Sequence, residues 1–427
     1  MTRLRISIKT LSPLYAGALK PYGSFLETHA QISGALLRGA VAQKTLPDCA
    51  APEFINNHEA CEVKDICPFY YLITGVEFPT CSVAEGGRPT ESPLRTMVTC
   101  KAAPGFTAQS TTQDPRHGVY DALLDHLAFT EWRRFGRIPT KLPRQRCAAC
   151  QAPLEPFTRR YVKEASERYH AAAALRTRRM THVGINRSRE TAERGLLFSV
   201  QAIAESTHFV GRMTVPTSWD GNRVTEFQNT LSSITRLGGE QTYGLGRVEI
   251  TVREEDDIGE DVPARISMFN ETFKEVWRQY TFEFPPREPE GDYLSIDLLT
   301  PALLTSPDGT PTVQLTVDML TMRAEELGYS DLPPVEPVIY RDASDRMHPL
   351  MFTAPMVVGG WSAAWGLPKR TALAAVGGSV YIFRTEHIGP WYEALAMIEA
   401  HGLGDRREEG FGAVRVCDPF HREVEAQ

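Results

Sequence analysis

The sequence predicts an α+β fold made of two copies of one small unit, because three features recur in the same order along the chain. Each half opens with an alternating strand that ends near a proline, at Arg3 to Leu14 and at Asp292 to Leu303. Each half then has a glycine-led apolar strand, GLLFSV from Gly195 and GSVYIF from Gly378. Near its end, each half has a glycine-rich loop that enters a strand, and these loops are the third feature.

The two glycine loops share one arrangement: paired glycines, a charged or polar spacer, Gly-x-Gly and an alternating strand. The first is GGEQTYGLGRVEI, from Gly238, and the second is GLGDRREEGFGAVRV, from Gly402. Glycine adopts positive φ and permits close backbone approach, so such a loop can clasp a phosphate chain, although a plain turn is the alternative. The predicted nucleic-acid contacts in the two loops are Gly239, Gln241, Tyr243, Gly244 and Arg406.

Length and composition are those of a globular protein. The chain has 427 residues, of which 42% are hydrophobic and 23% charged, enough for two or more cores. It shows neither an apolar leader nor a run of about 18 apolar residues, so we expect a cytoplasmic protein that does not span a membrane. Reduced cysteines are expected in that compartment, which favours metal ligation over disulfides where cysteines cluster.

Charge is unevenly distributed. The formal net charge is −7, yet the segment from Trp132 to Arg194 has 16 Lys or Arg against 5 Glu, a net charge of +11. A nucleic-acid site must therefore be local, and this segment predicts a basic arm along phosphates. A solvated helix from Tyr161 to Arg179 is the alternative. The predicted contacts in the arm are Arg178, Arg179, His182, Arg187 and Arg189.

The repeated features divide the chain into three parts. We predict an N-terminal unit over residues 1–255, a connector over 256–291 and a C-terminal unit over 292–427. The connector follows the acidic run REEDDIGED and contains one helix, from Ile266 to Tyr280. Residues 46–156 have no counterpart in the second half, so they are predicted to be an insertion in the first unit.

A helix is predicted from Thr28 to Gln43, where the apolar positions suit packing on a sheet. Ser33 and Gly34 at its start would offer free amides to a phosphate, and Arg38 would reinforce them. The alternative is that Gly34 only permits close helix packing. In the second half, Lys369 and Arg370 precede the glycine-led strand and are predicted nucleic-acid contacts.

Seven of the eight cysteines lie in the insertion. Cys147-Ala-Ala-Cys150 is typical of a zinc knuckle, in which a tight turn directs two thiolates at one ion. We predict Cys100 as the third ligand and His117 as the fourth, with Cys81 as the alternative fourth. Free buried cysteines are the alternative to a metal site. Further candidates for the same or another site are Cys49, Cys61 and Cys67.

The pattern as a whole resembles the RAMP superfamily, the repeat-associated proteins of CRISPR effector complexes. The resemblance extends from Leu4 to Val416 and is weakest in the insertion. Its nearest relatives by this resemblance are the Csx-ten family, Cas-five-like subunits of type III-D complexes. The matching stretches are SGALLRGAVA, THVGINRSRETAERGLLF, GGEQTYGLGRVEI, GWSAAWGLPKRTALAAVGGSVYIF and GLGDRREEGFGAVRV.

The resemblance implies two tandem ferredoxin-like units, similar to RNA-recognition motifs (RRM-like), each ending in a glycine-rich loop. It also implies a noncatalytic RNA-binding subunit of a type III effector complex in antiviral defence. Such a subunit would hold the 5′ handle of the CRISPR RNA (crRNA) and contact the large polymerase-like subunit and the Cas-seven-like backbone subunits. It would meet target RNA only indirectly.

An enzymatic alternative rests on His29. Processing ribonucleases of this superfamily cut RNA without metal, using a histidine near the first helix to move protons. His29 matches that place, but the sequence offers neither a convincing second acid–base group nor paired metal-binding carboxylates. We therefore expect a binding subunit, and the alternative is a metal-independent endoribonuclease that processes CRISPR repeat RNA.

Overall fold

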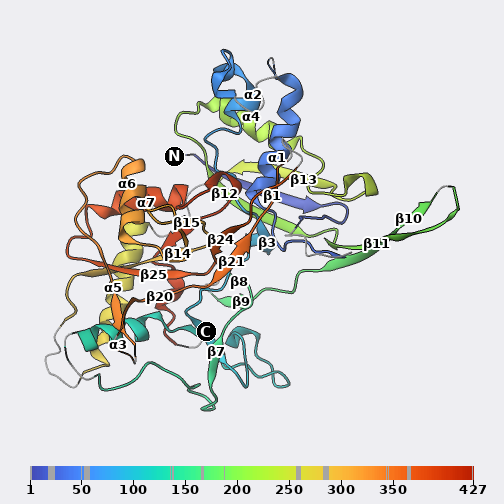
Figure 1. Cartoon of the computed structure of the whole chain (residues 1–427). Helices are drawn as coiled ribbons and strands as arrows, with labels where there is room; N and C mark the ends of the chain where they lie inside the picture. Colours follow the sequence, from blue (N-terminus) through green and yellow to red (C-terminus); the bar gives the residue numbers. More distant parts are fainter. Residues whose placement is uncertain are drawn as a thin grey trace.

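The computed structural model describes most of the chain (Figure 1). The described residues are 2–17, 25–49, 51, 58–134, 136, 139–164, 168–186, 188–255, 261–281, 288–342, 344, 346–362, 367–425 and 427. Arg187, one of the predicted arm residues, lies outside them. None of the described helices is long and apolar enough to cross a membrane.

The first unit is an antiparallel sheet with two helices, in the order strand, helix, strand, strand, helix, strand. The sheet order is β13-β1-β12-β3, with the short strand β4 beyond β3. The last strand therefore lies beside the first, and the first beside the third. The elements are β1 (Arg3–Thr10), α1 (Gly34–Thr45), β3 (Ser82–Glu85), β4 (Arg88–Pro89), β12 (His208–Thr214), α4 (Gly221–Ser232) and β13 (Val248–Glu254).

The second unit repeats this arrangement. Its sheet order is β26-β14-β25-β17, again last, first, third and second in chain order. The short strand β20 also pairs with β25. The elements are β14 (Asp292–Leu298), α6 (Val317–Glu326), β17 (Glu336–Pro337), β20 (Met351–Phe352), β25 (Val380–Thr385), α7 (Trp391–His401) and β26 (Val414–Val416).

Each unit also has a β-hairpin just before its third strand. In the first unit, β10 (Thr177–Asn186) and β11 (Thr191–Ile203) form a long hairpin that projects from the body (Figure 1). The solvated helix considered for Tyr161 to Arg179 is not found, because β8 (Tyr161–Lys163), β9 (Tyr169–Ala171) and the start of β10 occupy that range. The counterpart hairpin is β21 (Pro355–Val358) and β24 (Ala372–Ala375), followed outward by β22 (Trp361–Ser362) and β23 (Leu367–Pro368).

Alternation along the first strands determines the faces of both sheets. In β1, buried and partly exposed residues alternate, and Leu4, Ile6 and Ile8 form part of the first core with α1 and α4. A strand with one apolar face and one polar face suits a sheet that is covered by helices on one side. In contrast, nearly all of β14 is buried, because further elements cover both of its faces.

The predicted insertion is divided between the two units. Its earlier part belongs to the first unit, because Leu72, Val76 and Phe78 lie in the first core and β3 and β4 are strands of the first sheet. The predicted range of 46–156 is therefore too wide, since β3 is the counterpart of β17.

The later part, from Leu94, packs with the second unit. One large core joins insertion residues such as Phe106 and Trp132 to Tyr293, Trp391 and other residues of the second unit. The connector helix α5 (Val262–Arg278) belongs to the same core, where Trp132 and Trp277 stack with their ring centroids 4.4 Å apart. The elements of the later part are β5 (Met97–Cys100), β6 (Val119–Asp121), α3 (Leu123–Arg134) and β7 (Leu154–Pro156), whereas α2 (Pro68–Tyr71) lies in the earlier part, against α1.

A buried charged triad strengthens this association. His421 lies 3.2 Å from a carboxylate oxygen of Asp121 in β6 and 3.0 Å from one of Asp297 in β14. Burial alone would lower the pKa of His421, but the two carboxylates raise it well above its ordinary value. A charged imidazolium therefore joins the insertion to the second sheet.

Candidate metal centre and nucleic-acid interface

The four predicted metal ligands come together in the insertion. Cys100 ends β5, His117 lies just before β6, and Cys147 and Cys150 lie in the turn before β7. These three strands form one small sheet in the order β6-β5-β7. The turn closes with a hydrogen bond from the Gln151 amide to the Cys147 carbonyl oxygen, 2.9 Å.

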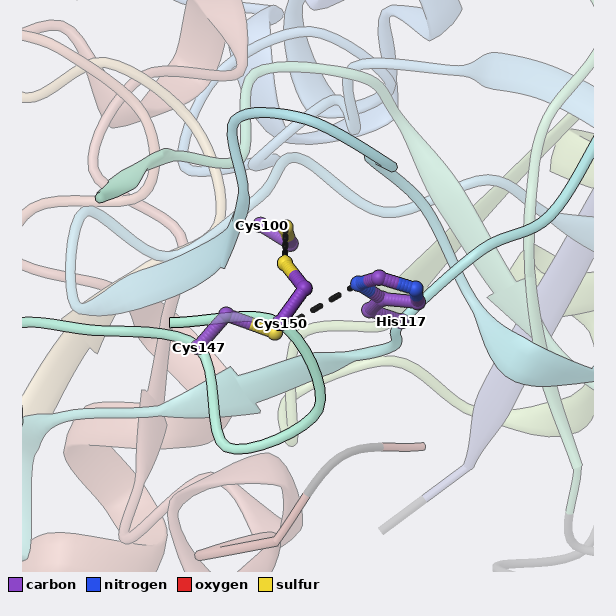
Figure 2. Close-up of side chains that lie close together, drawn as sticks. All are labelled: Cys100, His117, Cys147 and Cys150. Carbon is purple, nitrogen blue, oxygen red and sulfur yellow. Dashed lines mark hydrogen bonds between the residues drawn. The ribbon is translucent and has the colours of Figure 1, made fainter. Parts of the chain in front are cut away.

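The ligand atoms have the spacing of a tetrahedral site. All four lie within 4.8 Å of one another. Cys147 Sγ is 3.5 Å from His117 Nδ1, and Cys100 Sγ is 3.5 Å from Cys150 Sγ (Figure 2). Tetrahedral zinc separates a sulfur and a nitrogen ligand by about 3.6 Å and two sulfur ligands by about 3.8 Å. This Cys₃His group is therefore compatible with zinc.

The turn also favours the thiolate form of Cys147, which is the form that binds metal. Burial alone would raise the pKa of this thiol, but hydrogen bonds from the backbone of Cys150 and Ala149 outweigh burial. With the neighbouring thiols, they lower the pKa of Cys147 to about 7. Cys81, the alternative fourth ligand, is buried beside Gly211 in the first sheet and is not among the residues that could hold this metal.

The two glycine loops have the same backbone conformation. In the first loop, Glu240 and Gly244 have φ of 57° and 83° and flank the short turn η6 (Gln241–Tyr243). In the second, Arg406 and Gly410 have φ of 57° and 89° and flank η7 (Arg407–Glu409). Tyr243 and Glu409 therefore occupy equivalent positions in the two loops.

Each loop is fastened to its own unit by equivalent hydrogen bonds. The Gly239 amide donates to Tyr15 O, and the Gly246 amide to Pro13 O. In the second unit the amides of Asp405 and Gly412 donate to Leu303 O and Pro301 O. The outer glycines are also required sterically, because a Cβ on Gly238 would lie 2.2 Å from Tyr15 O.

These bonds correct the predicted use of the loop amides. The amides of Gly239 and Gly244 both donate within the chain, the latter to Gln241 O at 3.1 Å. Gln241 also turns inward, since its side-chain amide donates to Gly238 O at 2.9 Å. The first loop therefore presents side chains, above all Tyr243, where the sequence predicted a cradle of free amides.

The predicted phosphate site at the start of α1 is covered by the second loop. A Cβ on Gly34 would lie 2.1 Å from Phe78 O and 2.8 Å from Glu409 O. Gly34 is buried and Ser33 is half-buried, so the close-packing alternative describes Gly34 better than the anion site does. Arg38, one turn further along α1, is half-buried, and its Nε atom has no hydrogen-bond partner among the described residues.

The first loop meets the projecting hairpin in an aromatic cluster. His182 of β10 pairs across the hairpin with Phe198 of β11, and their rings stack 5.2 Å apart at 23°. The Tyr243 ring lies 5.0 Å from His182 and 6.5 Å from Phe198. Tyr243 is 57% exposed, and His182 Nε2 has no hydrogen-bond partner among the described residues. The sequence predicted His182 and Tyr243, and the structure brings them together.

The arginines of the arm have separate surroundings. Arg178 pairs with Glu205, which neutralises its charge locally. The Arg179 guanidinium lies 4.6 Å from the centre of the Phe25 ring in β2 (Phe25–Leu26), which pairs with β11. Arg189 is exposed in the turn of the hairpin.

The three basic residues predicted in the second half line one cleft of about 430 Å³ between the second loop and its hairpin. Lys369 and Arg406 both bind the buried carboxylate of Glu409. Burial alone would raise the pKa of Glu409, but these two hydrogen bonds lower it below its ordinary value. Arg370 is exposed at the same cleft.

His29 is exposed before α1, and its amide donates to Ala16 O at 2.8 Å. Among the described residues, no side-chain hydrogen bond or ion pair of its imidazole is found.

Sequence reasoning did not select Phe198, Phe25 or His58. Phe198 was within the predicted GLLFSV strand, but its partnership with His182 depends on the register of the hairpin. Phe25 stacks through a parallel pairing between segments more than 170 residues apart. Of these contacts, only the pairing of Phe198 with His182 could have been predicted from the sequence, by matching apolar and aromatic positions across the hairpin turn.

No family model and no curated protein matches the sequence. Among solved structures, the chain is similar to chains of the type III-B Cmr-beta complex, each at 12% identity. For the structure bound to cognate target RNA, the TM-score is 0.37, and the alignment covers 96% of this chain and 98% of that chain. For the structure bound to cognate target RNA and AMPPnP, the TM-score is 0.36, and the alignment covers 88% of this chain and 86% of that chain. For the structure of the apo state, the TM-score is 0.25, and the alignment covers 60% of this chain and 98% of that chain.

Proposed function

We propose that this chain is a noncatalytic guide-RNA-binding subunit of a type III CRISPR effector complex. In this proposal its two units are ferredoxin-like, and it holds the 5′ handle of the crRNA while contacting the large and backbone subunits. The observation that carries the proposal is the cluster of the exposed Tyr243 with the half-buried His182 and Phe198, where the projecting hairpin meets the first glycine loop.

The cluster has the chemistry of a single-strand binding surface. Unpaired bases stack on aromatic and histidine rings, and arginine planes beside them bind phosphate or stack in turn. Arg179 lies on the same hairpin but, three residues from His182 in the strand, on its opposite face, and Arg189 lies in the hairpin turn. The cleft lined by Lys369, Arg370 and Arg406 lies at the equivalent place in the other unit. Glu409 pairs with Lys369 and Arg406 there, so the exposed Arg370 is the cation most open to a phosphate.

The test is to purify the full chain with its natural complex and sequence the 5′ ends of the bound RNA. We expect RNAs that share one repeat-derived 5′ segment, and photocrosslinks from that segment to the cluster of His182, Phe198 and Tyr243. Absence of RNA, or RNA without a common end, would overturn the proposal. Crosslinks confined to other surfaces would overturn the assigned site.

A cleavage assay separates the binding subunit from the enzyme alternative. Repeat RNA is incubated in EDTA with the wild type and with His29→Ala. We expect neither protein to cut, since the described residues place no second acid–base group at His29. Cleavage by the wild type that is lost in His29→Ala with binding retained would establish the ribonuclease instead.

A further inference from the structure

A second group of metal-ligating side chains lies outside the first metal centre. The ligand atoms of Cys49, His58 and Cys67 all lie within 4.8 Å of one another, and all three residues are buried. His58 Nε2 is 3.5 Å from Cys49 Sγ and 3.6 Å from Cys67 Sγ. These separations match the roughly 3.6 Å expected between sulfur and nitrogen ligands of one tetrahedral zinc.

A fourth thiol, that of Cys61, lies in the same segment but outside the group whose ligand atoms are all within 4.8 Å of one another. Cys61 is buried, with 4% of its surface exposed, and it interacts electrostatically with Cys49. Its amide donates to His58 O at 3.0 Å, so His58 and Cys61 lie in one tight turn three residues apart. Structural zinc sites are commonly built from two pairs of ligands, and each pair lies a few residues apart on a tight turn. His58 and Cys61 have the spacing of one such pair.

The described residues between Leu46 and Tyr71 bury little apolar surface of their own. Its local cluster has three buried members, Cys49, Cys67 and Phe69, and two of these are candidate ligands. Its elements are short: η1 (Leu46–Asp48), η3 (His58–Ala60), η4 (Lys64–Ile66) and the four-residue α2. Small segments with so little apolar burial are commonly held by a metal or by disulfides.

Aromatic packing orients the imidazole toward the thiols. The His58 ring contacts Phe69 edge-on, with centroids 5.2 Å apart, and stacks on Tyr70 at 5.9 Å. These contacts hold the ring while Nε2 faces the two sulfurs. A ligand fixed before the metal arrives loses less conformational entropy on binding.

We propose that Cys49, His58 and Cys67 hold a second structural Zn²⁺, and that Cys61 completes a tetrahedral Cys₃His site. Both metal centres of the chain then have the same ligand set. The ion joins Cys49, which follows α1 and η1, to Cys67, which precedes α2. It fixes this segment against the first unit, and the proposal does not depend on RNA binding.

Metal analysis of the full-length protein tests the stoichiometry. We expect two zinc ions per chain in the wild type and one in the double variant Cys49→Ser/Cys67→Ser. The double variant Cys147→Ser/Cys150→Ser should also retain one. Cys81→Ser is the matched control, because it removes a buried thiol outside both groups and should retain two. A Cys49→Ser/Cys67→Ser variant with the same zinc content as the wild type would overturn the proposal.

A measurement on the wild type covers the case in which a variant fails to fold. The native protein is alkylated with and without a strong zinc chelator, and each cysteine is quantified by peptide mass spectrometry. We expect Cys49, Cys61 and Cys67 to gain reactivity together on chelation, while Cys81 does not change. Unchanged reactivity of Cys49 and Cys67 on chelation would overturn the site. A Cys61 that reacts equally with and without chelator would overturn its assignment as the fourth ligand.

Discussion

The two glycine loops share a backbone and differ in what surrounds them. In the second loop, Gly410 and Glu409 are buried against α1 of the first unit, and Thr80 donates to Gly410 O at 3.0 Å. In the first loop, Tyr243 and Gly244 are exposed, and a Cβ on Gly244 would meet no atom within 4 Å. One loop geometry therefore joins the two units at one place and presents a free aromatic surface at the other.

The side chains at equivalent positions explain this difference. Where the first loop has Gln241 and Tyr243, the second has Arg407 and Glu409. Arg407 Nε lies 3.3 Å from a carboxylate oxygen of Glu77 in the first unit. The carboxylate of Glu409 accepts hydrogen bonds from Arg406 and Lys369. Charged residues form the interface between the units, whereas the aromatic residue of the first loop is exposed. A shared loop motif thus does not assign a shared function.

The largest expected effect is on stability, when the glycine at the same left-handed position of each loop is replaced by alanine. Gly410→Ala should lower the free energy of unfolding by roughly 2–5 kcal/mol, from left-handed strain plus overpacking. The added Cβ would lie 2.9 Å from the Thr80 amide nitrogen and 3.0 Å from that of Gly34. Gly244→Ala should cost only about 1–2 kcal/mol, the strain alone. Urea unfolding measures both, and equal losses would show that the second loop does not join the units.

Removing the aromatic side chain of the first loop should affect RNA and leave folding intact. Tyr243→Ala should weaken single-stranded RNA binding by about 1–3 kcal/mol, or roughly 5- to 150-fold. Fluorescence anisotropy at fixed salt measures the affinity. The matched control is Tyr340→Ala, which removes a tyrosine that is 38% exposed and lies beside His348 in the second unit. Equal weakening in both variants would contradict a specific role for the first loop.

The ion pairs that hold the second loop should contribute less. Glu77 accepts from His401 Nδ1 at 3.1 Å and lies 3.3 Å from Arg407 Nε, with its side chain partly exposed. Glu77→Gln should lower the free energy of unfolding by about 1 kcal/mol, and less at high salt. Glu336→Gln, which breaks a pair between Glu336 and Arg384 within the second unit, is the control and should cost less. If Glu336→Gln lowered the free energy of unfolding more than Glu77→Gln does, Glu77 would contribute little to the stability of the interface.

Acid should loosen the second loop without affecting the equivalent position in the first. The pKa of Glu409 is lower in the folded state than its ordinary value, so ionised Glu409 stabilises the fold at neutral pH. That contribution is lost as pH falls below about 4.5 and through the lowered pKa. Unfolding measured between neutral and acidic pH should show a smaller acid dependence in Glu409→Gln. An unchanged acid dependence would mean that Glu409 does not contribute to it.

The sequence by itself determined the elements whose signals are local. The strands β1 and β14, the glycines at positive φ and the Cys147–Cys150 turn all depend on neighbouring residues, and each was predicted at its place. The ligand set of Cys100, His117, Cys147 and Cys150 was also predicted, because few other soft ligands lie close in the chain. Helix ends were less accurate: the predicted Thr28 to Gln43 helix begins at Gly34, after a short bridge at Ile32.

Only the tertiary structure decided which surfaces remain free. Gly34 and Gly244 are both glycines in loop-to-helix or loop-to-strand junctions, yet one lies under a neighbouring backbone and the other faces open space. Likewise, the later part of the insertion lies between strands of the first unit in sequence, but its apolar residues complete the core of the second unit. Burial depends on contacts between segments that can lie hundreds of residues apart in the chain. A local sequence pattern therefore does not determine which of two similar surfaces will be covered.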